Sequence, residues 1–99
     1  MVRHIILWKL KDMPEAEKAT VKANIKSGLE GLMGTIPGLT AISVKTNGLA
    51  SSNADVMLDS AFTDEAALKG YAVHPAHVKV ADTYVRPFTE IRLCLDFED

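Results

Sequence analysis

The segment Val2–Leu10 constrains the fold of this chain more than any other, because it is apolar on both of its alternating faces. As a strand, it would point Ile6 and Trp8 to one side and Ile5 and Leu7 to the other. A strand with two apolar faces has to be covered on both sides. The segment is therefore predicted to be an inner strand of a layered fold.

The segment that follows predicts a long helix with one apolar face. Pro14, Glu15 and Glu17 favour a helix start, because proline suits the first helical position and carboxylates suit the positive end of the helix dipole. Beyond them, apolar residues recur every three or four positions and form a stripe that would face the core. Gly34 and the run Ile36-Pro37-Gly38 are expected to end the helix. The stripe comprises Val21, Ile25, Leu29, Leu32 and Ile36.

Three more strands and a second helical crossover complete the predicted order βαββαβ. Thr63 is expected to cap the second crossover helix. The pair His74-Pro75 interrupts that helix, because the residue before a proline avoids the α region. Pro75 can begin a new helical segment that reaches to about Val85. The strands are predicted at residues 39–46, 55–62 and 89–97.

This order predicts an α+β fold in which a four-stranded antiparallel sheet carries its helices on one face. The other face would be bare and apolar, which is unusual for a monomer. A second copy packed face to face would cover it and give a two-fold dimer with a barrel-like centre. Asp59 and Arg92 are expected on the same face, paired across it or within it. The apolar residues expected there are Ile5, Leu7, Met57, Ala61 and Cys94.

Length, charge and cysteine content exclude several classes of function. Ninety-nine residues are expected to form one domain over residues 1–99, since chains divide only well above this length. A net charge of −2 argues against a nucleic-acid partner, which would need a basic stripe. Cys94 is the only cysteine, so neither an intrachain disulfide nor a cysteine-based zinc site is expected. No run resembles a signal peptide or a membrane span, which favours a cytoplasmic protein without a membrane partner.

Residues suited to acid–base chemistry gather around the break in the second crossover. His77 lies early in the helix after the break, where backbone N–H groups lower the pKa of an imidazole and keep it neutral. Tyr71 lies one turn before the break, so both side chains could face the space between helix and sheet. His4 shares its strand face with Ile6 and Trp8. If that face turns toward the helices, His4 would lie in the same space as Tyr71 and His77.

Each of these residues also has a purely structural interpretation. His77 could bond only to solvent or backbone, Tyr71 could be a core aromatic, His4 a satisfied core histidine, and Trp8 a packing residue. His74 and His77 straddle a proline with no carboxylate at a supporting spacing, so no metal site is predicted. The chain has no Gly-x-Ser-x-Gly element and no phosphate-binding loop, and no cofactor is expected.

The stretch YAVHPAHVKVADTY at residues 71–84 resembles the stress-responsive dimeric α+β barrel (Dabb) family. The opening VRHIILWKLK, the IPGL at residues 36–39 and the closing RPFTEIRLCLDFE look like the same family, in the same order. The resemblance implies a ferredoxin-like protomer and a homodimer that is joined through its sheets.

The family includes a plant cyclase that closes a linear polyketide by an aldol condensation, and the resemblance implies a related pocket here. His77 matches the catalytic histidine of that enzyme, Tyr71 matches the tyrosine that assists it, and His4 matches a pocket histidine. Val56 and Trp8 match pocket positions that hold a histidine and a smaller aliphatic residue, which implies a smaller ligand for this chain. The substrate-binding residues are predicted to be His4, Ile6, Trp8 and Val56.

Two hypotheses about function follow. The first is a cofactor-independent acid–base enzyme, similar to a polyketide cyclase or an isomerase, that uses His77 and Tyr71 on a small carbonyl-containing ligand. The second is a non-catalytic homodimer that binds a small apolar or carbonyl-containing compound or serves as a stress-associated structural unit. A cavity of at least roughly 300 Å³ that reaches His77, Tyr71 and His4 would favour the first hypothesis. Trp8 filling that space would favour the second.

Overall fold

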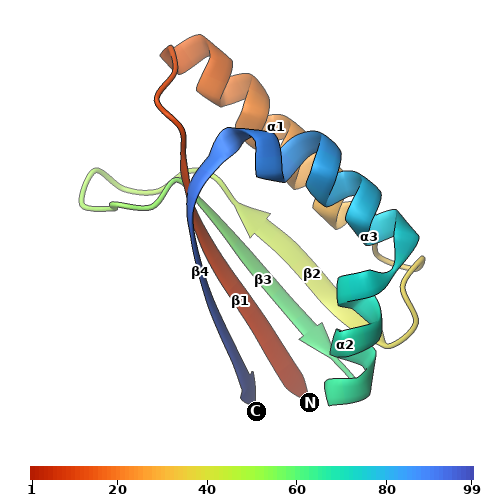
Figure 1. Cartoon of the computed structure of the whole chain (residues 1–99). Helices are drawn as coiled ribbons and strands as arrows, with labels where there is room; N and C mark the ends of the chain where they lie inside the picture. The colour runs from red at the N-terminus through yellow and green to blue at the C-terminus, as the bar shows by residue number, and fades with distance from the viewer.

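A computed structural model, which describes residues 1–99, contains one antiparallel sheet with helices over one of its faces (Figure 1). The strand order is β2-β3-β1-β4, so the first strand is an inner one, as its two apolar faces predict. This arrangement confirms the predicted order βαββαβ and the placement of the helices. The strands are β1 (Val2–Leu10), β2 (Leu39–Lys45), β3 (Val56–Phe62) and β4 (Thr89–Glu98).

Two helical crossovers connect these strands. The first is α1 (Glu15–Glu30), and Pro14 precedes it as the N-cap residue and is not the first helical residue that the sequence suggested. The second begins with α2 (Glu65–Val73), which is capped by the Asp64 carboxylate and not by Thr63 as expected. That carboxylate accepts a hydrogen bond of 2.8 Å from the backbone N–H of Ala67.

The second crossover breaks at His74, as the sequence predicts. His74 adopts extended backbone angles of φ −65° and ψ 131°, because the ring of Pro75 excludes the α conformation there. Its imidazole accepts a 3.1 Å hydrogen bond from the backbone N–H of Ala76 and so caps the next helix. The chain continues through α3 (Pro75–Val80), a π turn over residues 81–85 and a 3₁₀ turn over residues 86–88.

The hydrophobic core lies between the sheet and the helices. The even-numbered residues of β1 and β3 point into it, and all of them are buried. The apolar stripe predicted for the first helix packs against these residues from the helix side of the sheet. Its last two members, Leu32 and Ile36, follow the end of α1 and are also buried in the core. The most deeply buried side chains of the core include Ile25, Leu29, Val44, Leu58 and Phe62.

The opposite sheet face, called the open face below, is apolar and has no cover in the monomer. Leu93 and Leu95 keep 63% and 64% of their surface exposed there, although both are large hydrophobic residues. They stand beside the odd-numbered residues of β1, since β4 pairs Leu95 with Ile5 and Leu93 with Leu7. The open face therefore carries Ile5, Leu7, Met57, Ala61, Ile91, Leu93, Leu95 and Phe97.

The side chains of β4 face the opposite way from the sequence-based assignment. Cys94 and Arg92 were expected on the open face, but they pair with Ile6 and Trp8 of β1 and therefore lie on the helix side of the sheet. Alternation shows that a strand has two faces, but only its pairing register decides which face turns toward the helices. The apolar set of β4 turns outward, because this edge strand extends the open face and not the core.

The expected charge pair on the open face takes a different form. Asp59 bonds to Arg3, which also lies 3.5 Å from the carboxylate of Asp99. Arg92 takes part in none of the salt bridges of the structure. Its guanidinium charge is instead available on the helix side of the sheet.

Candidate functional site

A cavity of about 630 Å³ lies between the sheet and the second crossover. It exceeds the size that small-molecule sites require, and apolar side chains form more than half of its lining. Trp8 forms part of the wall and leaves this space open. The cavity therefore meets the criterion that favours ligand chemistry.

The cavity brings together five of the six residues that the sequence singled out. His4, Ile6 and Trp8 reach it from β1, Tyr71 from α2 and His77 from α3. Val56 does not line this cavity: only 1% of its surface is exposed, and it packs within the hydrophobic core.

Three rings stand in a row along one wall of the cavity. The Tyr71 ring lies 4.1 Å from the His77 ring, centroid to centroid, and the two planes are inclined by 34°. On its other side, Tyr71 meets His4 edge to face at 6.0 Å, and Phe62 supports it from the core at 5.0 Å. The extended backbone at His74 makes this row possible, because it redirects the chain between the helices that carry Tyr71 and His77.

The hydroxyl group of Tyr71 is buried and has no hydrogen-bond partner. Only 2% of the residue is exposed, so bulk water does not satisfy the group. An unpartnered buried hydroxyl is costly and usually serves a ligand or an ordered water. Burial raises the pKa of the phenol well above its usual range, and the nearby charge of Arg92 only partly offsets this. The hydroxyl is therefore protonated at neutral pH and is an unused hydrogen-bond donor in a residue of the cavity wall.

The imidazole of His77 is held in one tautomer. Its Nδ1 lies 3.3 Å from the backbone carbonyl oxygen of Ala72, which can only accept, so Nδ1 carries the proton and Nε2 carries the lone pair. Burial lowers the pKa of His77, and the charges of Arg86, His4 and Arg92 act in the same direction against the hydrogen bond to Ala72. The predicted direction of the shift is confirmed, but its main cause is burial in the cavity wall and not the end of a helix.

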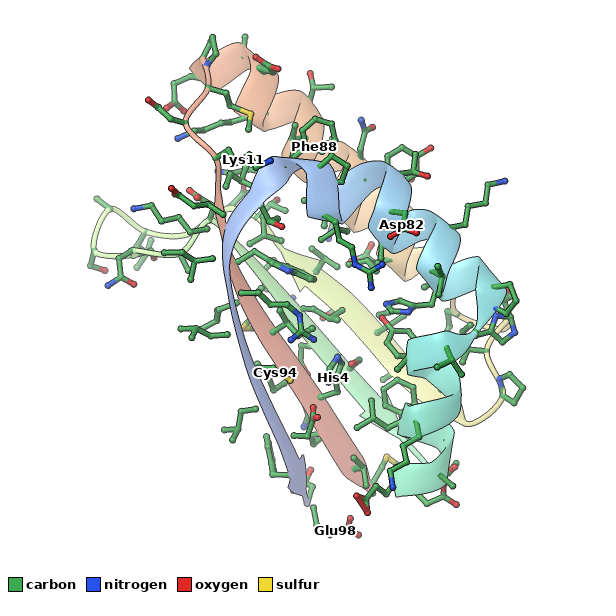
Figure 2. The ribbon with its side chains drawn as sticks, in the orientation of Figure 1. His4, Lys11, Asp82, Phe88, Cys94 and Glu98 are labelled. Atoms are coloured by element: carbon green, nitrogen blue, oxygen red, sulfur yellow. The ribbon has the colours of Figure 1, made fainter.

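Strand β4 also lines the cavity, with residues that were not predicted from the sequence to belong to the site. Arg92, Cys94 and Asp96 line the cavity from the helix side of the sheet. Asp96 bonds to Nδ1 of His4, and Figure 2 shows His4 and Cys94 on neighbouring strands beneath the crossover. The alternation of Arg92, Cys94 and Asp96 with apolar residues was visible in the sequence. Which face of the sheet these three side chains occupy depended on the register of β4 against β1.

Arg92 places a positive charge where several functional groups meet. Its charge lowers the pKa of Tyr71, of His77 and of the Cys94 thiol, although burial still raises the pKa of that thiol overall. Three groups from three different elements therefore lie within its electrostatic reach. A negative charge that develops on a bound ligand would be stabilised there.

Comparison with known proteins agrees with this architecture. The model of the Stress Responsive A/B Barrel Domain (Dabb) family matches residues 2–99. A crystal structure from Bacteroides fragilis, described as a dimeric protein of unknown function with a ferredoxin-like fold, is 33% identical with a TM-score of 0.93. The match covers 99% of this chain and 95% of that one. No curated protein sequence matches the chain.

More distant structures share the fold alone. A Dabb family protein from Mesorhizobium loti is 20% identical with a TM-score of 0.75, and the match covers 99% of this chain and 95% of that one. A hydroxynitrile lyase from Passiflora edulis is 17% identical with a TM-score of 0.70, and the match covers 97% of this chain and 90% of that one.

None of the helices of the present protein combines the length and the apolar character that a membrane crossing requires.

Proposed function

The chain belongs to the stress responsive A/B barrel family, and from that premise we propose that it is a homodimeric acid–base enzyme for small carbonyl compounds. His77 removes a proton from the carbon next to a carbonyl group, and Tyr71 donates a hydrogen bond to the carbonyl oxygen. This proton transfer itself needs no cofactor. A cyclisation by aldol condensation and an isomerisation through an enol both begin with this step.

The observation that carries the proposal is the buried hydroxyl of Tyr71, which has no partner in a cavity wall that it shares with His77. The hydroxyl is a donor at neutral pH, because burial opposes its ionisation. A ligand carbonyl would satisfy it. As the α proton leaves, that oxygen gains negative charge, so the same hydrogen bond would strengthen in the transition state.

His77 supports the proposal as the base. The hydrogen bond to Ala72 assigns the free lone pair to Nε2, and the lowered pKa keeps the ring neutral near pH 7. The Tyr71 and His77 rings lie 4.1 Å apart, centroid to centroid, so a ligand whose carbonyl oxygen is held by Tyr71 would lie beside His77. Arg92 would add stabilisation to the enolate through its charge.

The remaining cavity residues support a short ligand. Ile6 and Trp8 offer apolar walls, and His4, held by its bond to Asp96, offers a polar group beside Tyr71. The indole of Trp8 forms part of the wall where the resemblance places a smaller aliphatic residue. We therefore expect a small carbonyl compound and not a long polyketide chain.

The dimer in this proposal forms through the open face. The structure from Bacteroides fragilis is described as dimeric, and a face with several exposed large hydrophobic residues is the kind of surface that a second copy covers. Sheet-to-sheet packing would leave the helices and the cavity on the outside of each protomer.

A proton-exchange experiment tests the chemistry without knowledge of the natural substrate. A panel of small ketones, β-diketones and β-keto acids is incubated with the protein in D₂O, and loss of the α-proton signal is followed by NMR. We expect catalysed exchange for at least one compound. His77→Gln should slow it by roughly 10²–10⁴-fold, and Tyr71→Phe by roughly 10²–10³-fold.

Two matched variants control for indirect effects. Tyr84→Phe removes the only other tyrosine hydroxyl, which lies outside the cavity, and His74→Asn keeps a side chain that can cap α3. Both should exchange at the wild-type rate. If panel compounds bind but none exchanges, the protein is the non-catalytic binding dimer of the second hypothesis. Full exchange in His77→Gln would remove the base role.

A further inference from the structure

Three potential metal ligands converge at one point of the cavity wall, apart from the Tyr71–His77 pair. Nδ1 of His4, the sulfur of Cys94 and a carboxylate oxygen of Asp96 all lie within 4.8 Å of one another. The sulfur is 3.8 Å from the nitrogen and 3.4 Å from the oxygen. Ligands in a tetrahedral zinc site stand about 3.3–3.7 Å apart, given metal–ligand bonds of about 2.0–2.3 Å. Both sulfur distances are therefore close to those of a metal site, whereas Nδ1 of His4 and the Asp96 carboxylate hydrogen-bond directly to each other and would have to move apart to admit an ion.

The pairing of two strands holds these ligands in position. Cys94 and Asp96 are two residues apart on β4, so their side chains leave the same face of the sheet. His4 stands directly opposite Asp96 in the β1–β4 register, and Cys94 pairs with the next same-face residue, Ile6. Because backbone hydrogen bonds set this arrangement, the three residues need no rearrangement of the fold to share a cation.

The same geometry argues against a cysteine nucleophile activated by His4. In such a triad, one imidazole nitrogen takes the thiol proton while the other bonds the carboxylate. Here a single nitrogen, Nδ1, faces both Cys94 and Asp96. Burial and the neighbouring Asp96 also raise the pKa of the Cys94 thiol, which opposes a free thiolate. A bound cation would reverse that preference, since coordination deprotonates a thiol.

We propose that His4, Cys94 and Asp96 form a Zn²⁺ site with three protein ligands and a fourth position open to the cavity. Mixed nitrogen, sulfur and oxygen ligands suit this ion, and three protein ligands with an open position are typical of its reactive sites. On binding, the thiol proton goes to solvent and the His4 proton moves from Nδ1 to Nε2. The two negative ligands outweigh the charge of Arg92, so the site remains attractive to a dication.

This site differs from what the sequence predicted. Only His74 and His77 were considered as metal ligands, and a single cysteine excluded sites built from several cysteines. A mixed site needs only one cysteine, and its carboxylate and imidazole come from residues 92 positions apart in the chain. The site goes beyond the proposed proton transfer, because it shares only His4 with it and involves neither Tyr71 nor His77.

Cobalt substitution tests the site directly. Metal-free protein is titrated with Co²⁺, and binding is followed by the intense visible bands of tetrahedral cobalt and by the near-ultraviolet charge transfer from thiolate to cobalt. Zn²⁺ affinity is then obtained by competition. Since Cys94 is the only cysteine, a charge-transfer band can come from no other residue. We expect one Co²⁺ per chain with that band present.

The variants separate this site from general metal binding. Cys94→Ser should abolish the charge-transfer band, and Asp96→Asn should weaken Zn²⁺ binding by roughly tenfold or more. Glu98→Gln, on the same strand face but outside the cluster, should leave both signals unchanged. Far-ultraviolet circular dichroism verifies that each variant is folded. A weak octahedral cobalt spectrum without charge transfer in the wild type would overturn the site, and so would unchanged Zn²⁺ affinity in Cys94→Ser. Neither result would affect the proton-exchange test of His77.

Discussion

The substitution Leu95→Lys should weaken the proposed dimer strongly, because it places a charge at the most exposed large hydrophobic residue of the open face. Leu95 pairs with Ile5 across β4 and β1 and is 64% exposed in the monomer. Full burial of a leucine side chain contributes about 1.5–3 kcal/mol. Covering the exposed part of Leu95 would therefore stabilise a dimer by about 1–2 kcal/mol for each copy.

Two-fold symmetry doubles this effect. Each dimer contains the substituted position twice, so the loss amounts to about 2–4 kcal/mol before any cost of burying the lysine charge. At about 1.4 kcal/mol per factor of ten, the dissociation constant should rise by roughly 30- to 1,000-fold. The folded protomer should persist, since a lysine is well tolerated on the exposed face of an edge strand.

Sedimentation velocity over a range of protein concentrations measures this change. Val73→Lys is the matched control, because Val73 is a similarly apolar residue, 76% exposed, on α2 and away from the open face. It should leave the dissociation constant unchanged. Equal dissociation constants for wild type and Leu95→Lys would refute the assignment of the interface to the open face, and a monomeric wild type would refute the dimer itself.

Three further predictions concern the pH dependence of His77 and the two glycines with positive φ angles. The exchange rate should fall as the pH decreases, with its midpoint below the ordinary histidine pKa of 6.5, because protonated His77 is no base and burial lowers its pKa; an NMR rate profile with a midpoint above 6.5 would contradict this. For the same reason, the unfolded state binds more protons below pH 6.5, so wild type should lose more stability on acidification than His77→Gln in urea titrations. Gly38→Ala should lower the free energy of unfolding by at least about 2 kcal/mol more than Gly34→Ala does. Gly38 and Gly34 both have positive φ angles, of 82° and 87°, but only at Gly38 would a new Cβ lie 2.4 Å from the Cβ of Ala67. Equal urea midpoints for the two glycine variants would show that α2 moves aside freely.

Local chemistry was sufficient to predict most of the elements. The two apolar faces of residues 2–10 identified an inner strand, and the stripe from Val21 to Leu29 identified the buried side of α1. The break at His74 followed from the restriction that Pro75 places on the residue before it. The cap of α2 was misplaced by one residue, because Thr63 and Asp64 are both good capping residues and only the backbone path selects between them.

Part of the candidate site could also be predicted from local sequence patterns. Tyr71 and His77 lie close together in the chain, so one local break was enough to suggest that they meet. His4 could be added because its strand face was evident from alternation with Ile6 and Trp8. Val56 followed from the resemblance alone, and the structure places it in the core and not on the cavity wall.

The direction of β4 was decided only by the tertiary structure. Its alternation is compatible with either face toward the helices, and a shift of one residue in pairing would exchange Cys94 and Asp96 for Leu93 and Leu95. That register depends on contacts with β1, which lies about ninety residues earlier in the chain. Rules based on neighbouring residues do not predict contacts at that separation. The sequence alone therefore determined which elements form and where the second crossover breaks. Tertiary pairing decided which side chains of β4 enter the cavity and which form the open face, because strand register is a long-range property of the chain.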